Sequence, residues 1–152
     1  MPANLRKAEA DYADLTQSGT PGKLELALTV EDAVREADVA VDFVPDELES
    51  KLEIFSMIDR MAPPKTILCT PSYALSITDL ASCVYRPERC VAVRGNLLCG
   101  SAAEAPVVRL LYPAAAAEST LTAMVDFLRT LGVEARQEAD PDVPVLMKNA
   151  VG

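Results

Sequence analysis

Short apolar runs alternate along this chain with longer segments whose apolar residues recur at helical spacing. The short runs, rich in β-branched residues, are typical of buried parallel strands. They lie at residues 39–44, 66–69, 90–93 and 107–111, with further strands expected at 24–28 and 133–137. The helical pattern is expected at residues 4–15, 30–37, 47–61 and 114–131, with a short helix beginning at residue 76. Strands that alternate with helices predict an α/β domain with a mostly parallel sheet.

The helix expected at 47–61 carries an apolar stripe, predicted to pack against the sheet: Leu48, Leu52, Phe55 and Ile58. Thr29 is placed to cap the helix that follows it, and Gly132 is placed to close the helix before it. The alanines at 114–117 are expected to begin that last helix.

The chain divides into three expected parts. Residues 1–23 are predicted to form a helix and a turn, residues 24–139 the α/β domain, and residues 140–152 a linker or the start of a helix. A length of 152 residues with 50% hydrophobic residues suits one domain with a substantial core.

Charge and hydropathy exclude several classes of partner. The formal net charge is -9, which argues against nucleic acid and against an anionic membrane surface. No apolar run reaches the roughly 18 residues of a membrane span, and the charged first residues lack the apolar middle of a signal peptide. We therefore expect a cytoplasmic protein.

The chain has no histidine, so a Ser-His-Asp or Cys-His catalytic arrangement is impossible within these 152 residues, and so is a Cys/His zinc site. Its cysteines are Cys69, Cys83, Cys90 and Cys99. None forms a C-x-x-C pair. We expect them to be reduced and to serve packing, and we expect no metal site.

Several segments, in order, resemble the NAD-binding domain of the 3-hydroxyacyl-CoA dehydrogenase family. Val39-Ala-Val-Asp-Phe-Val-Pro-Asp46, with Lys51 five residues on, resembles a strand of that domain and its acidic and lysine positions on the cofactor side. Residues 67–78 resemble the family's Asn-Thr-Ser segment, and Pro87-Glu-Arg89 resembles the approach to its catalytic His. Residues 142–149 resemble the junction to the family's helical C-terminal domain. The resemblance implies a three-layer Rossmann-like domain, NAD as cofactor and a place in fatty acid metabolism.

The chain departs from the family at positions that carry chemistry. It contains no G-x-G-x-x-G motif, so we expect a domain that lacks the N-terminal βαβ glycine-loop unit. By the resemblance, the catalytic His falls at Arg94 and its Glu partner at or near Arg109. An arginine stays protonated and cannot act as a base. The family's later Asn falls near Leu97 or Asn96, and Phe43 stands where the family has a small residue.

Four residues are candidates for a surviving cofactor or anion site: Asp46, Lys51, Ser72 and Arg94. They follow strands on the side where parallel sheets bind ligands. Alternatively, Asp46 is a helix-terminal residue stabilised by the helix dipole and Lys51 is a solvated partner of Glu47. Arg94 and Arg109 form an anion site or, alternatively, are surface charges paired with acidic neighbours.

Other residues are given structural or functional interpretations. Ser72, Ser76 or Thr78 is expected to cap the short helix near residue 76. Tyr73 either covers a ligand or is an ordinary loop residue. Lys148 is either a solvent-facing lysine or the counterpart of the catalytic lysine of β-hydroxyacid dehydrogenases.

Three hypotheses about function follow. The chain is a catalytically inactive relative of the dehydrogenases, a non-catalytic module that binds a small anion, a nucleotide or a protein, or a fragment of a larger NAD-dependent oxidoreductase. Because a sheet without the glycine-loop unit exposes an edge, we also expect a homodimer that covers this edge.

Overall fold

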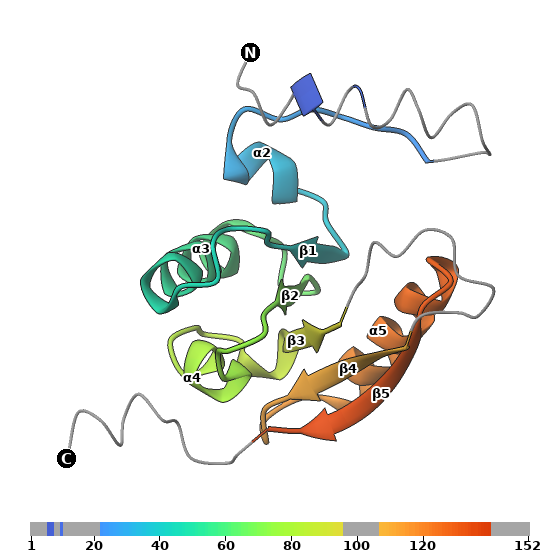
Figure 1. Cartoon of the computed structure of the whole chain (residues 1–152). Coiled ribbons are helices and arrows are strands. Elements are labelled where there is room, and N and C mark those ends of the chain that lie inside the picture. The colour runs from blue at the N-terminus through green and yellow to red at the C-terminus, as the bar shows by residue number, and fades with distance from the viewer. Residues whose placement is uncertain (1–5, 8–9, 11–21, 96–106, 141–152) are drawn as a thin grey trace.

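The computed structural model describes residues 6–7, 10, 22–95 and 107–140 (Figure 1). The described helices are α2 (Val30–Val34), α3 (Leu48–Met61), α4 (Ile77–Ala81) and α5 (Glu118–Thr130), with a 3-10 turn at Pro87–Arg89. The strands are β1 (Val39–Val41), β2 (Ile67–Pro71), β3 (Cys90–Arg94), β4 (Val107–Tyr112) and β5 (Glu134–Ala139). Of the helix expected at 4–15, residues 6, 7 and 10 are described and are helical.

The strands form one sheet in the order β1-β2-β3-β4-β5. Three neighbouring pairs are parallel, and only β3 and β4 run antiparallel. This confirms the predicted mostly parallel sheet. The chain follows the spatial order of the strands, so β1 and β5 are the edges of the described sheet.

Helices cover both faces of the sheet, giving the three layers expected from the sequence (Figure 1). One core lies under α2, α3 and α4 and includes Phe55, Leu80 and Ala92. The other lies under α5 and includes Val91, Leu110 and Met124. Because successive strand residues point to opposite faces, Val91 and Ala92 belong to different cores. Burial of Phe55 and Ile58, with Leu48 and Leu52 packed beside them, confirms the predicted stripe.

The predicted caps are confirmed. The Thr29 side chain accepts a hydrogen bond from the amide of Asp32 at 3.1 Å and begins α2. Gly132 has a φ of +76° and closes α5. The amides of Gly132 and Val133 donate to Arg129 and Leu128 at 2.9 Å each, the pattern of a Schellman motif.

One predicted strand and the start of one predicted helix are wrong. Residues 24–28 do not form a strand: they have no partner strand in the described sheet, and Leu28 is 83% exposed. The alanines at 114–117 do not begin α5, which starts at Glu118. The amide of Ala116 donates to Pro113 and that of Ala117 to Glu88, and these bonds form a turn before the helix.

Candidate functional site

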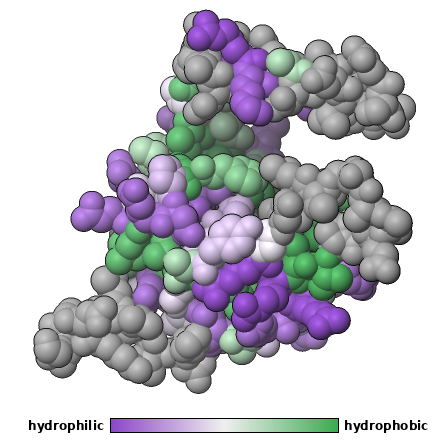
Figure 2. Space-filling model, viewed as in Figure 1, coloured by the Kyte–Doolittle hydropathy of each residue, from purple (hydrophilic) through white to green (hydrophobic). Residues whose placement is uncertain are grey.

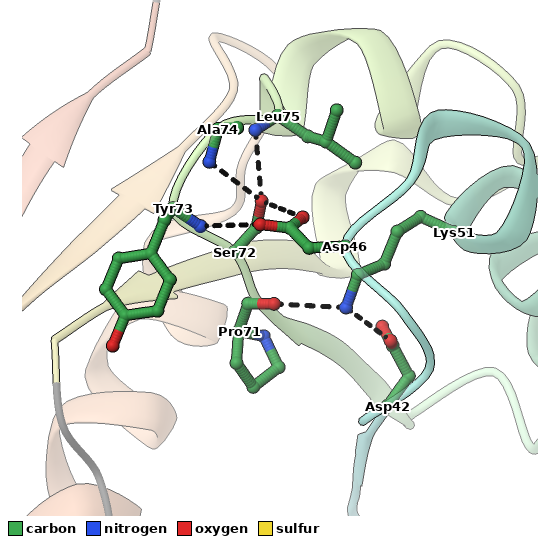
Figure 3. Close-up of polar contacts among 8 residues, drawn as sticks. All are labelled: Asp42, Asp46, Lys51, Pro71, Ser72, Tyr73, Ala74 and Leu75. Atoms are coloured by element: carbon green, nitrogen blue, oxygen red, sulfur yellow. Dashed lines mark hydrogen bonds and ion pairs between the residues drawn. The ribbon is translucent and has the colours of Figure 1, made fainter.

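The four candidate residues meet around one turn, which follows the carboxyl end of β2 and leads to α4. Figure 3 draws this turn with Asp46, Lys51 and Ser72. β2 ends at Pro71, and Ser72 continues its pairing by donating its amide to the carbonyl of Val93 at 3.1 Å. The Ser72 hydroxyl then accepts from the amide of Leu75 at 3.0 Å, which folds the turn back on itself. The carboxyl edge of the sheet is where parallel sheets bind ligands.

Asp46 holds this turn from the side of α3. Its carboxylate accepts from the Ser72 hydroxyl at 2.6 Å and from the Tyr73 amide at 3.0 Å. Partial burial favours a higher pKa for Asp46, but these hydrogen bonds and the nearby charge of Lys51 outweigh it and lower the pKa. Asp46 lies one residue before the N-cap of α3, Glu47, and so is not a residue of the helix itself.

Lys51 is buried, and the solvated pairing with Glu47 is therefore wrong. Its side chain and that of Asp42 are each 1% exposed, and the two form an ion pair at 2.7 Å. The Lys51 ammonium also donates to the carbonyl of Pro71 at 3.0 Å. The lysine thus joins the end of β1 to the end of β2 through α3 (Figure 3).

Arg94 holds the same turn from the end of β3. Its guanidinium donates to the carbonyl of Ser72 at 3.3 Å and to that of Leu75 at 2.8 Å. These partners are backbone carbonyls, and no ion pair between Arg94 and an acid is found among the described residues. Arg109 does have such a partner, because it makes a two-pronged ion pair with Glu138 at 2.7 Å on each side.

Arg94 and Arg109 are Cα partners across the antiparallel β3–β4 ladder. The two positions assigned by resemblance to the His and Glu of the dehydrogenases are therefore neighbours in space. The Arg109 guanidinium lowers the pKa of Glu138 by hydrogen bonding and charge, and Arg94 adds a smaller effect of the same sign.

A second carboxylate holds the far end of the turn. Asp140 accepts from the Ser76 hydroxyl at 2.5 Å and from the Thr78 amide at 2.9 Å. Ser76 is also the N-cap of α4, accepting from the Asp79 amide at 3.3 Å, so the predicted cap is confirmed. Tyr73 is 73% exposed, and its hydroxyl lies 3.5 Å from the carbonyl of Gly95.

Sequence reasoning missed Asp42 and Asp140. Asp42 is a charged residue within a predicted buried strand, which is a signal for a buried partner. Lys51 lies three residues after Leu48 and four before Phe55, so it is on the apolar face of α3. This spacing indicates that Lys51 is the buried partner of Asp42. No sequence signal connects Asp140 to Ser76, 64 residues away.

The cysteines divide into two groups. Cys69 and Cys90 are buried, as predicted, and burial raises the pKa of each thiol to about 12. Cys83 is exposed, so the packing role expected for it is wrong. Cys99 lies outside the described residues, as do Asn96, Leu97 and Lys148.

Known proteins identify the family. A sequence profile described as "3-hydroxyacyl-CoA dehydrogenase, NAD binding domain" matches residues 4–135. The chain belongs to the 3-hydroxyacyl-CoA dehydrogenase NAD-binding domain family. An L-carnitine dehydrogenase of Burkholderia mallei is 30% identical over 135 residues, or 88% of this chain and 41% of that protein. A probable 3-hydroxybutyryl-CoA dehydrogenase of Bacillus subtilis is 31% identical over 71 residues, or 47% of this chain and 24% of that protein.

Solved structures show the same fold. The chain matches the 3-hydroxybutyryl-CoA dehydrogenase of Escherichia coli with a TM-score of 0.72 and 21% identity, over 90% of this chain and 31% of that one. An NAD+-dependent 5-dehydrogenase of a pyridine carboxylic acid matches with a TM-score of 0.75 and 22% identity, over 99% of this chain and 51% of that one. The chain thus spans less than half the length of the curated relatives it matches.

Within the described residues, no group of His, Cys, Asp and Glu side chains is arranged to hold a metal ion. In the same part of the chain, no helix has the length and apolar character needed to cross a bilayer.

Asp46→Asn is expected to lower the free energy of unfolding by about 1 kcal/mol at pH 7, the size of a partly exposed hydrogen-bond loss. The pKa of Asp46 is lower in the folded chain, so its ionised form adds stability above the pKa of the unfolded chain. This contribution is lost as the pH falls through the lower, folded value. Urea unfolding between pH 2 and pH 7 should show that the free energies of unfolding of the wild type and of Asp46→Asn become equal in acid. A difference that is the same at every pH would contradict the role of the carboxylate.

Proposed function

We propose that these 152 residues form a non-catalytic member of the family, which keeps the fold of the NAD-binding domain without the acid–base chemistry of the dehydrogenases. The observation that carries the proposal is the set of hydrogen bonds that Arg94 makes to the backbone. Its guanidinium is bound to the carbonyls of Ser72 and Leu75, and it serves the architecture of the turn. An arginine cannot take the proton from a substrate hydroxyl at neutral pH.

The rest of the site supports the proposal. Arg109 is engaged by Glu138, and Lys51 by Asp42 and Pro71. Among the 152 residues there is no histidine to supply an alternative general base of ordinary pKa near 7. The NAD-binding loop of the family, G-x-G-x-x-G, is not part of this sequence either.

The test is an assay of NADH formation from NAD and 3-hydroxybutyryl-CoA, with the purified chain and Arg94→Ala in parallel. For both proteins we expect the absorbance of NADH to stay at the level of the protein-free blank. A rate that rises in proportion to the wild-type chain and is absent from Arg94→Ala would contradict the proposal. The Arg94→Ala arm separates turnover by this chain from turnover by a contaminating dehydrogenase.

A second candidate function is the binding of a nucleotide or another small anion at the same turn. It is favoured by the meeting of Asp46, Lys51, Ser72 and Arg94 at the carboxyl edge of the sheet. NADH fluorescence, titrated with the chain, tests this function separately. Saturable binding that Arg94→Ala abolishes would support it, and binding that is indifferent to this change would count against the four residues.

A further inference from the structure

The turn at residues 72–75 presents carbonyl oxygens on one side and hydrogen-bond donors on the other. The carbonyl of Ser72 is bound by the Arg94 guanidinium at 3.3 Å, and that of Leu75 at 2.8 Å. The peptide bond between Ser72 and Tyr73 is trans, so its C=O and its N–H point in opposite directions. Because Arg94 holds the carbonyl of this peptide, the amide of Tyr73 is aimed away from Arg94.

A carboxylate occupies the donor side of the turn. One oxygen of Asp46 accepts from the Ser72 hydroxyl at 2.6 Å and the other accepts from the Tyr73 amide at 3.0 Å (Figure 3). Burial favours a higher pKa for Asp46, but the hydrogen bonds from the turn and the charge of Lys51 lower the pKa. The environment therefore favours the ionised group. Two donors, each matched to one oxygen of a carboxylate, form a recognition site for that group.

We propose that this turn is a carboxylate-binding site, which the chain fills with its own Asp46 and which accepts a small free carboxylate once that side chain is removed. Hydrophilic residues cover the middle of the molecular face around β2 and β3 in Figure 2. Asp46 and Tyr73 are both exposed, so a ligand can reach the site from solvent.

The covalent tether decides which carboxylate occupies the site. Asp46 is held next to the turn by the end of β1 and the start of α3, which gives its carboxylate a high effective concentration. A free anion has no such advantage, and the formal net charge of -9 opposes its approach. An external anionic group therefore has to displace Asp46 in order to bind at the turn.

The inference deepens the second candidate function, on which it rests for the location of the ligand. The two are tested by different measurements. NADH titration of the wild type tests the nucleotide site, whereas formate titration of a variant without the Asp46 carboxylate tests the carboxylate site. NADH binding with no formate binding would overturn the inference and leave the second candidate function standing.

Chemical rescue with formate tests the site. Asp46→Ala removes the carboxylate, and formate supplies the same group as a free ion. Sodium formate at several hundred millimolar is expected to raise the Tm of this variant by about 2–4 °C relative to the same concentration of sodium chloride. The wild type, whose site is filled, is expected to respond equally to the two salts. Asp46→Asn is the matched control, because its amide fills the space, and it is expected to show no preference for formate.

The amide of Tyr73 gives a direct readout by NMR. Formate is expected to move this amide proton of Asp46→Ala downfield and to saturate, because a donor to a carboxylate is deshielded. In the wild type the same proton is expected to move upfield when acid protonates Asp46, a result that needs no variant.

Three results would overturn the proposal. The first is a folded Asp46→Ala with no preference for formate in its Tm or in its Tyr73 amide. The second is a wild-type Tyr73 amide that is indifferent to the protonation of Asp46, since the carboxylate would then not fill the site. The third is an equal gain in Tm for Asp46→Ala/Ser72→Ala, which lacks the donor hydroxyl, since formate would then bind elsewhere.

Discussion

Lys51→Met is expected to lower the free energy of unfolding by about 3–5 kcal/mol, the usual loss when one partner of a buried ion pair is removed. The lysine and Asp42 are each 1% exposed, so the substitution leaves a carboxylate without its cation in the interior. The second carboxylate oxygen of Asp42 has no hydrogen-bond partner among the described residues, which leaves the lysine as its principal stabilisation. Urea denaturation at pH 7 measures the loss.

The matched control removes both charges. Asp42→Ala combined with Lys51→Met is expected to cost clearly less than the sum of the two single substitutions, because no uncompensated charge stays buried. Additive losses would mean that the pair contributes no coupling, and the account of Lys51 as an internal ion-pair partner would be wrong.

Gly95→Ala is expected to lower the free energy of unfolding by about 3 kcal/mol. Gly95 directly follows β3 and has a φ of +135°, a conformation that costs other residues roughly 1–3 kcal/mol. A Cβ at this position would also lie 2.9 Å from Cγ1 of Val108 and 3.2 Å from its Cα. Val108 is 1% exposed and is held in the core beneath α5, so it has little room to move. Thermal and urea unfolding measure the change.

Gly132→Ala is the control that separates strain from contact. Gly132 also has a positive φ, +76°, but apart from its chain neighbours no described residue has an atom within 4 Å of the position of its Cβ. Its substitution is expected to cost only the left-handed conformation, about 1 kcal/mol. Equal losses at the two glycines would show that the contact with Val108 has no effect on stability.

Much of the scaffold follows from local sequence. The caps at Thr29 and Ser76, the close of α5 at Gly132 and the stripe on α3 each depend on residues within a few positions of one another. Local hydrogen bonding and helical spacing determine such features, so a single sequence can show them.

Features that depend on distant partners could not be predicted in the same way. The strand expected at residues 24–28 has the right pattern, but the segment pairs with no strand of the described sheet. The residues of β4 do not indicate that this strand runs antiparallel to β3. Arg94 was recognised as a replacement for a catalytic residue, but its two carbonyl partners belong to a turn about 20 positions earlier. Only the fold brings that turn to the end of β3.

We propose that Arg94, at a position that by resemblance serves chemistry in the dehydrogenases, serves the architecture of the turn in this chain. The most direct measurement is the free energy of unfolding of Arg94→His, with Arg94→Lys as the control that keeps the charge. The account predicts a loss of about 2 kcal/mol for the histidine variant, because charge-assisted hydrogen bonds to two backbone carbonyls disappear. A smaller loss is expected for the lysine variant, which can reach only one of them. A histidine variant as stable as the wild type would contradict the claim.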